Sequence, residues 1–91
     1  MLTLELTSKF RKDFKKAKKR GLDMSLLLDV VNDLLEEKTL DEKYLDHALT
    51  GNYKGFRECH LQPDWLFVYK IDGERLVLVA SRTGTHSDLF E

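Results

Sequence analysis

The spacing of apolar residues changes twice along this chain, and this change limits the folds that it can adopt. Residues 1–6 alternate leucine with polar residues, which predicts a half-buried strand. Residues 8–37 repeat apolar side chains every three or four positions, which predicts two helices separated near Gly21. From residue 55 onward the pattern is again that of strands. The two helices are therefore expected to lie between strands of one sheet.

Capping residues and charge define the two predicted helices more closely. Thr7 or Ser8 begins the first helix, and Asp23 or Ser25 begins a second one that ends near Glu37. The narrow apolar face of the first helix comprises Phe10, Phe14 and Ala17. Opposite that face, lysines form a basic stripe: Lys9, Lys12, Lys16 and Lys19. Helices joined by a short turn are expected to form an antiparallel pair.

The second half of the chain predicts three further strands. They span residues 55–61, 65–71 and 75–81. Asp72-Gly73 predicts a two-residue hairpin turn, and residues 38–52 lack periodicity, which predicts a connecting loop. The element order β-α-α-β-β-β indicates an α+β fold with a mostly antiparallel sheet packed by the helix pair. We expect one domain over residues 1–91.

The composition excludes several classes of protein. Hydrophobic residues make up 42% and charged residues 34% of 91 residues, which is typical of a globular domain. The lone Cys59 excludes an internal disulfide framework and favours a reducing compartment. No apolar run approaches the ~20 residues that span a bilayer, and the first six residues do not resemble a secretory signal. We therefore expect a cytoplasmic protein that does not contact membranes.

The three histidines are the main candidates for chemistry. His60 and Asp64 flank the turn between two predicted strands, and His86 follows the next strand. Strands adjacent in sequence are usually adjacent in space, so these residues are expected at one edge of the sheet. Alternation along the strand places Cys59 and His60 on opposite faces. Histidines beside a carboxylate and arginines are what metal-free cleavage of a phosphodiester requires.

A metal site is the rival interpretation of the same residues. By type, zinc ligands are available in His47, His60, His86 and Asp64. The chain nevertheless contains neither an H-x-x-x-H nor an H-E-x-x-H spacing. The sequence therefore predicts neither a metal nor another cofactor.

Three segments closely resemble the YafQ-type branch of the RelE toxin superfamily. The first is Asp46-His47 with Leu49 and Gly51; the second runs from Tyr53 to Trp65 and contains R-x-x-H-x-x-P-D-W; the third is R-T-G-T-H-x-x-L-F at residues 82–90. The resemblance spans nearly the whole chain and includes its length and element order. It implies a RelE-like fold.

The resemblance also implies an activity and partners. Toxins of this branch belong to type II toxin–antitoxin systems, enter the A site of the 70S ribosome and cut translated mRNA without a metal. A cognate antitoxin silences them. The matching active-site positions would be His47, His60, Asp64 and His86, with Phe90 as the C-terminal aromatic residue. Candidates for binding phosphate and mRNA are Lys54, Arg57 and Arg82.

Two departures from the branch keep other functions open. Ala48 stands where the branch is expected to have proline, and the sequence pI of about 6.3 is low for a superfamily that tends to be basic. One alternative is a non-enzymatic toxin of the same fold that acts on gyrase. The other is a decayed protein that retains only antitoxin binding. The histidines argue against the first alternative, because a protein clamp needs no proton shuttle. The low pI is the only support for the second.

Overall fold

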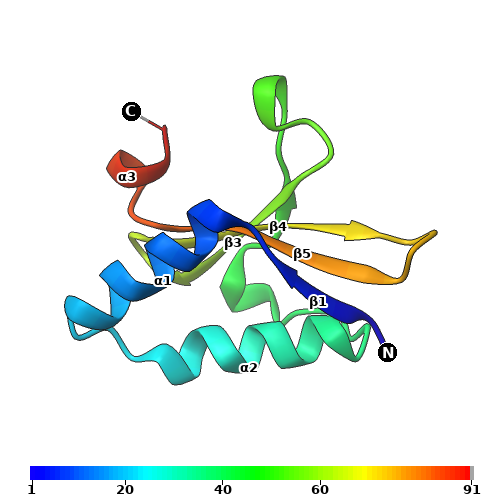
Figure 1. The fold of residues 1–91 in the computed structure, drawn as a ribbon, viewed down its shortest axis with the longest axis horizontal. Coiled ribbons are helices and arrows are strands. Elements are labelled where there is room, and N and C mark those ends of the chain that lie inside the picture. Colours follow the sequence, from blue (N-terminus) through cyan, green and yellow to red (C-terminus); the bar gives the residue numbers. More distant parts are fainter. Residues whose placement is uncertain (91) are drawn as a thin grey trace.

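The strands form one five-stranded sheet in the order β1-β5-β4-β3-β2 in the computed structural model, which describes residues 1–90 (Figure 1). Their bounds are β1 Thr3–Leu6, β2 His47–Ala48, β3 Arg57–Gln62, β4 Trp65–Asp72 and β5 Val77–Gly84. β1 pairs with β5 in parallel, and the other neighbours are antiparallel. The predicted α+β class and mostly antiparallel sheet are confirmed. Glu91, the last residue of the expected domain, lies outside the described residues.

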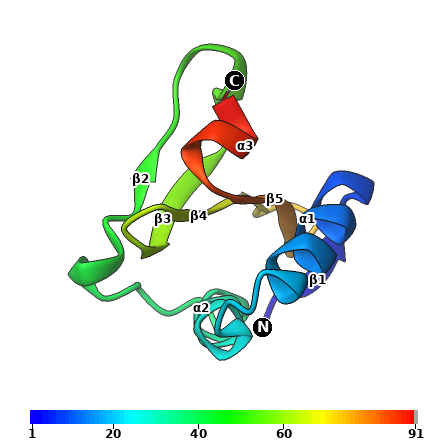
Figure 2. The same cartoon turned by 90° about the vertical axis from the view of Figure 1, so that its left-hand side faces the viewer.

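Two helices cover one face of the sheet (Figures 1 and 2). Helix α1 spans Ser8–Lys19 and helix α2 spans Met24–Leu35. The side chains of Thr7 and Asp23 accept hydrogen bonds from the first turns of these helices, as the capping analysis predicted. Gly21 adopts a φ of +78° between them, a conformation that side chains disfavour. The two helices therefore run in opposite directions across the same layer.

The strands present a different set of side chains to each face. Toward the helices, one apolar core joins Cys59, Leu61, Phe67 and Tyr69 to the buried residues of α1 and α2. On the opposite face, Leu66 and Val68 pack with Leu89 of helix α3, which spans His86–Phe90. Figure 2 shows α3 and the segment leading into β3 on that second side of the sheet. This second face carries the histidines.

The connections differ from the sequence prediction in two places. The β4–β5 hairpin is not a two-residue turn at Asp72-Gly73, because Asp72 pairs with Val77 and four residues lie between them. The left-handed residue of this loop is Leu76, with a φ of 55°. The predicted loop 38–52 contains the two-residue strand β2 and 3₁₀ turns at Glu42–Tyr44 and Gly51–Tyr53. Short strands of this length carry no detectable alternation.

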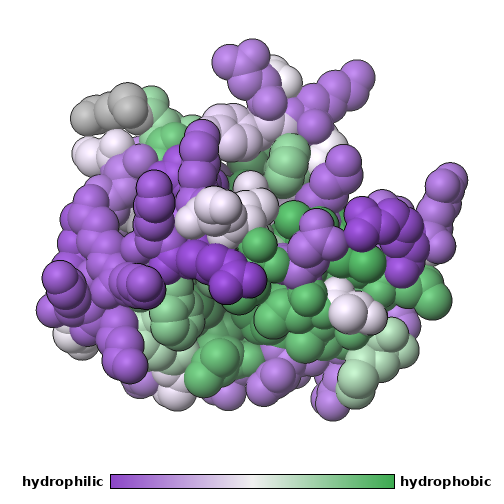
Figure 3. Space-filling model, in the orientation of Figure 1, coloured by the Kyte–Doolittle hydropathy of each residue, from purple (hydrophilic) through white to green (hydrophobic). Residues whose placement is uncertain are grey.

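The helix side of the molecule also exposes an apolar groove between β1, α1 and α2 (Figure 3). Leu4 and Leu28 are the most exposed of its apolar residues, and Phe10, Phe14 and Val31 line its interior. Exposed apolar patches of this kind are typical of protein–protein contacts. No helix among residues 1–90 has the length and apolar character that crossing a membrane requires.

Candidate active site

Three imidazole rings lie in a row on the face of the sheet opposite α1 and α2. His47 comes from β2, His60 from β3 and His86 from the first position of α3. The ring centroids of His47 and His60 are 6.2 Å apart, and those of His60 and His86 are 5.9 Å apart. The structure therefore brings together the three histidines that the sequence analysis selected.

Strand pairing explains why two of these rings share a face. His47 lies directly opposite Glu58 in the β2–β3 pair, and His60 follows Glu58 by two positions on β3. Residues at i and i+2 of a strand point to the same side, so all three side chains meet there. Cys59 points the other way and is fully buried in the helix-side core, as predicted.

Glu58 is a site residue that the sequence analysis did not select. Its carboxylate is only 6% exposed, and Oε1 lies 3.8 Å from Nε2 of His47 and 3.5 Å from Nε2 of His60. Burying a carboxylate is costly unless cations or donors face it, and two imidazoles face this one. The alternation that separates Cys59 from His60 already indicates that Glu58 shares the face of His60.

Asp64 and His86 form a second carboxylate–histidine pair beside the first. Asp64 lies in the β3–β4 turn, and its Oδ1 accepts from the backbone N–H of His86 at 3.0 Å and lies 2.7 Å from Nδ1 of the ring. These hydrogen bonds hold the pKa of Asp64 below its ordinary value. Because a carboxylate only accepts, Nδ1 of His86 carries the hydrogen and Nε2 remains available to a substrate.

The loop before β2 fixes the ring of His47 in a similar way. Nδ1 of His47 lies 2.8 Å from the carbonyl oxygen of Leu45, so this nitrogen donates and Nε2 faces Glu58. Leu45 has a left-handed φ of 52°. The next residue, Asp46, accepts from the Tyr69 hydroxyl at 2.5 Å and from the Arg57 guanidinium at 3.0 Å. Asp46 thereby ties the His47 loop to the sheet.

The two predicted phosphate-binding arginines have different positions. Arg57 shares the strand face of Cys59, opposite His60, and its guanidinium is paired with Asp46. Its position does not support a contact with substrate at the histidines. Arg82 lies on the histidine side, opposite Val68 of β4, and its guanidinium is paired with Asp13 of α1 at 2.7 Å. The hydrogen bonds that its guanidinium donates to Asp13 raise the pKa of Arg82.

Aromatic and basic residues flank α3 near the row of histidines. Phe90 is 44% exposed and packs edge-on against Tyr53, with ring centroids 5.4 Å apart. Tyr53 also donates a 3.4 Å hydrogen bond to the carbonyl of Leu89. Lys54 follows the 3₁₀ turn that carries Tyr53 and is exposed. Phe90 and Lys54 are therefore accessible to a ligand that approaches this face.

Residues 2–91 match the model of the bacterial toxin YafQ of type II toxin–antitoxin systems. The chain belongs to the YafQ family. The predicted family resemblance is thus confirmed over nearly the full length, including the segments that carry the three histidines.

Individual relatives cover the same length. The mRNA interferase toxin YafQ from Escherichia coli K12 is 39% identical over 88 residues, which are 96% of this chain and 94% of the relative. A metal-bound toxin from Helicobacter pylori is 50% identical, with 99% and 100% of the two chains covered and a TM-score of 0.93. YafQ in the E. coli DinJ–YafQ complex is 37% identical, with both chains fully covered and a TM-score of 0.91.

The H. pylori toxin is metal-bound, and this chain also holds a group of side chains with potential metal-ligating atoms. His47, Glu58 and His60 each offer a ligand atom, and these atoms lie within 4.8 Å of one another. Two imidazoles and a carboxylate suit zinc or copper. This set differs from the one considered from the sequence, since Asp64 and His86 pair with each other. The set fits a metal, which would occupy the same nitrogens that proton transfer requires.

Proposed function

We propose that this chain is the toxin of a type II toxin–antitoxin system and a metal-independent endoribonuclease that cuts translated mRNA in the ribosomal A site. The row of three imidazoles around buried Glu58, with Asp64 fixing the ring of His86, is the observation that carries this proposal. Such groups supply both a base and an acid near neutral pH. The E. coli relative is named an mRNA interferase toxin.

The reaction needs one group to take a proton and another to deliver one. A base removes the proton of the RNA 2′-hydroxyl, the oxygen attacks the adjacent phosphorus, and an acid protonates the departing 5′-oxygen. We assign the base to His60 or His47, beside Glu58, and the acid to His86. Arg82 and Lys54 would stabilise the phosphate charge. The product is a 2′,3′-cyclic phosphate and a free 5′-hydroxyl.

An antitoxin partner is part of this proposal. Its support is the DinJ–YafQ complex, together with the apolar groove between β1, α1 and α2. That groove lies on the helix side, so an antitoxin seated there leaves the histidines unaltered. Variants of the histidines should therefore retain antitoxin binding.

Induced expression followed by mapping of mRNA ends tests the function. Cuts that appear within translated reading frames, and that disappear when translation initiation is blocked, support the proposal. Altered plasmid supercoiling without cuts would instead favour gyrase as the target. Growth unaffected by the parent protein, with antitoxin binding retained, would favour a decayed toxin.

The leaving group tests the assignment of His86. A sulfur atom at the scissile 5′-position leaves without being protonated. On such an mRNA, the loss caused by His86→Ala should largely vanish, whereas the loss caused by His60→Ala should persist. Equal losses on the oxygen and sulfur substrates would overturn the assignment of His86 as the acid.

A further inference from the structure

A reciprocal hydrogen-bonded cap fixes the start of the short helix that carries His86. Thr85 precedes α3, and its hydroxyl accepts from the backbone N–H of Asp88 at 3.0 Å. The carboxylate of Asp88 accepts from the backbone N–H of Thr85 at 3.0 Å. This arrangement is a capping box, and His86 is the first residue inside it. The direction of the His86 side chain therefore depends on how this box is held.

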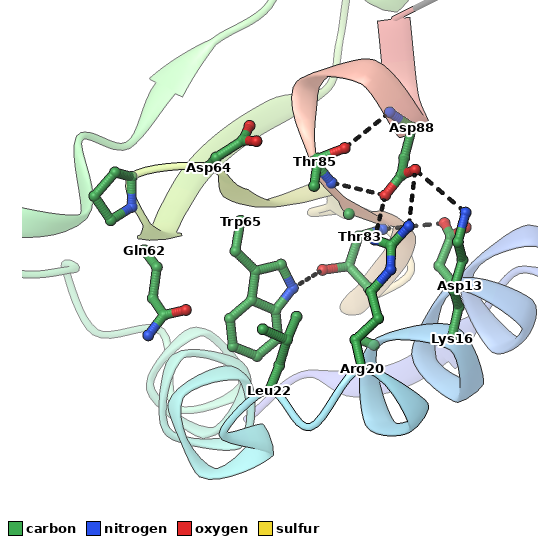
Figure 4. Close-up of a pocket in the computed structure, with 13 residues that line it drawn as sticks. Asp13, Lys16, Arg20, Leu22, Gln62, Asp64, Trp65, Thr83, Thr85 and Asp88 are labelled. Atoms are coloured by element: carbon green, nitrogen blue, oxygen red, sulfur yellow. Dashed lines mark hydrogen bonds and ion pairs between the residues drawn. The ribbon is translucent and has the colours of Figure 1, made fainter.

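The same Asp88 carboxylate is bound by two cations at the C-terminal end of α1, Lys16 within the helix and Arg20 directly after it (Figure 4). Arg20 donates to it at 2.8 Å and 3.4 Å, and Lys16 at 3.2 Å. Asp88 is only 17% exposed, and its hydrogen bonds, above all those from Arg20, hold its pKa well below the ordinary range. These contacts join the C-terminal end of α1 to the first turn of α3 across a pocket of about 420 Å³.

The other contacts of α3 do not replace the link from Asp88 to Lys16 and Arg20 in fixing the position of this helix. A helix of five residues is not stable alone, because nucleation outweighs its few hydrogen bonds. Leu89 anchors one side of α3 in the small core with Leu66 and Val68. Tyr53 holds the C-terminal end of α3 through the carbonyl of Leu89 and the ring of Phe90. Near His86 itself, the other contact is Asp64, whose side chain is 66% exposed. The Asp88 carboxylate also packs closely on Gly84, because a Cβ at that position would lie 2.9 Å from Asp88 Oδ2.

We propose that Arg20, acting through Asp88, is a positioning residue that orients His86 in the site. The inference rests on the proposed catalytic role of His86. It also gives the basic end of α1 a structural role, since Lys16 and Arg20 both bind Asp88. Lys16 contributes to the same tie, so the predicted basic stripe contains one lysine that is already paired.

The first test observes the free protein, without any RNA. In Arg20→Gln, nuclear Overhauser contacts between the His60 and His86 rings should weaken, and the amides of residues 86–90 should become mobile on the nanosecond timescale. Arg20→Lys keeps a cation and should restore part of the order. Lys18→Gln is the matched control, since Lys18 is exposed on the same turn and its side chain makes no ion pair among residues 1–90. Ring contacts and amide order unchanged in Arg20→Gln would overturn the proposal.

The second test separates positioning from RNA binding. Arg20→Gln should lower kcat about tenfold with KM nearly unchanged, because misplacing a catalytic group by about 1 Å costs up to ~10²-fold. The double variant with Asp88→Asn should be no slower than Asp88→Asn alone. A raised KM with unchanged kcat and an ordered α3 would make Arg20 an RNA contact and overturn the proposal. If the parent cuts no RNA, the proposed function fails while the spectra still decide whether Arg20 positions His86.

Discussion

The two faces of the sheet come from the same strands but carry different kinds of side chain. Toward α1 and α2, side chains are apolar and interlock in one core. On the other face, His47, Glu58, His60 and His86 meet from three segments, and a small apolar cluster under α3 supports them. Stability therefore resides mainly on the helix face, whereas the other face carries the proposed active site. Substitutions on the two faces should therefore have separable effects.

The largest expected effect is on the histidine face. His60→Ala or His86→Ala should reduce cleavage by about 10²–10⁴-fold, because each removes a proposed general acid or base. Both side chains lie outside the helix-side core. For the exposed His86, the substitution should change the unfolding free energy by no more than ~0.5 kcal/mol. Cleavage of programmed ribosomes and urea unfolding measure the two quantities. Cleavage by both variants at the rate of the parent protein would show that neither histidine takes part in the reaction.

The helix face should show the opposite behaviour. Leu27 is 1% exposed, and Leu27→Ala should lower the unfolding free energy by about 2–5 kcal/mol through lost burial and a cavity. The rate per folded molecule should remain close to that of the parent. Leu28→Ala, at a half-exposed position on the same helix, is the matched control and should cost much less. If Leu27→Ala lowers kcat under conditions in which the variant is fully folded, the effects on stability and on catalysis do not separate between the two faces.

The exposed lysines of α1 form a surface that belongs neither to the apolar core nor to the histidine face of the sheet. Lys9, Lys12 and Lys19 are exposed and make no ion pair among the residues described. Changing all three to Gln should weaken ribosome binding about tenfold at low salt and reduce its salt dependence, since fewer counterions are released. Affinity measured against salt concentration checks this. If the parent and the variant give the same affinity at every salt concentration, the stripe is only a solvated helix face. The RNA contacts would then be expected around Lys54 and Arg82.

The smallest expected effect concerns Asp88, where α1 meets α3. Asp88→Asn should cost about 1 kcal/mol at neutral pH, as capping losses do. Because the folded-state pKa of Asp88 is lowered, its contribution is present above the ordinary aspartate pKa of about 3.9 and is lost as pH falls below it. The stability difference between parent and variant should therefore shrink in acid. Asp29→Asn, an exposed change on α2, should give a curve parallel to that of the parent.

Periodicity in the sequence predicted the helix face well. The spacing of Phe10 and Ala17 identified the buried side of α1, and alternation placed Cys59 opposite His60. The same alternation places Arg57 beside Cys59, which argues against the phosphate contact predicted for it. Predictions based on repeated apolar spacing succeeded because each helix turn or strand pair repeats the same burial.

The histidine face could be predicted only in part, because its geometry depends on single residues. The left-handed Leu45, the bulge after His60 and the two-residue β2 leave no periodic trace. Glu58 was missed because an isolated acidic residue in a strand normally indicates exposure, whereas here two imidazoles allow its burial. The link from Arg20 to Asp88 joins residues far apart in sequence and required the structure.

The chemistry of the cut ends tests the central claim most directly. Purified toxin is added to ribosomes programmed with a defined mRNA, with a chelator that removes zinc and copper but spares magnesium. Acid–base attack by the 2′-hydroxyl predicts that the upstream fragment ends in a 2′,3′-cyclic phosphate at an undiminished rate. An upstream 3′-hydroxyl with a downstream 5′-phosphate, or cleavage that stops with the chelator and returns with zinc, would contradict the claim.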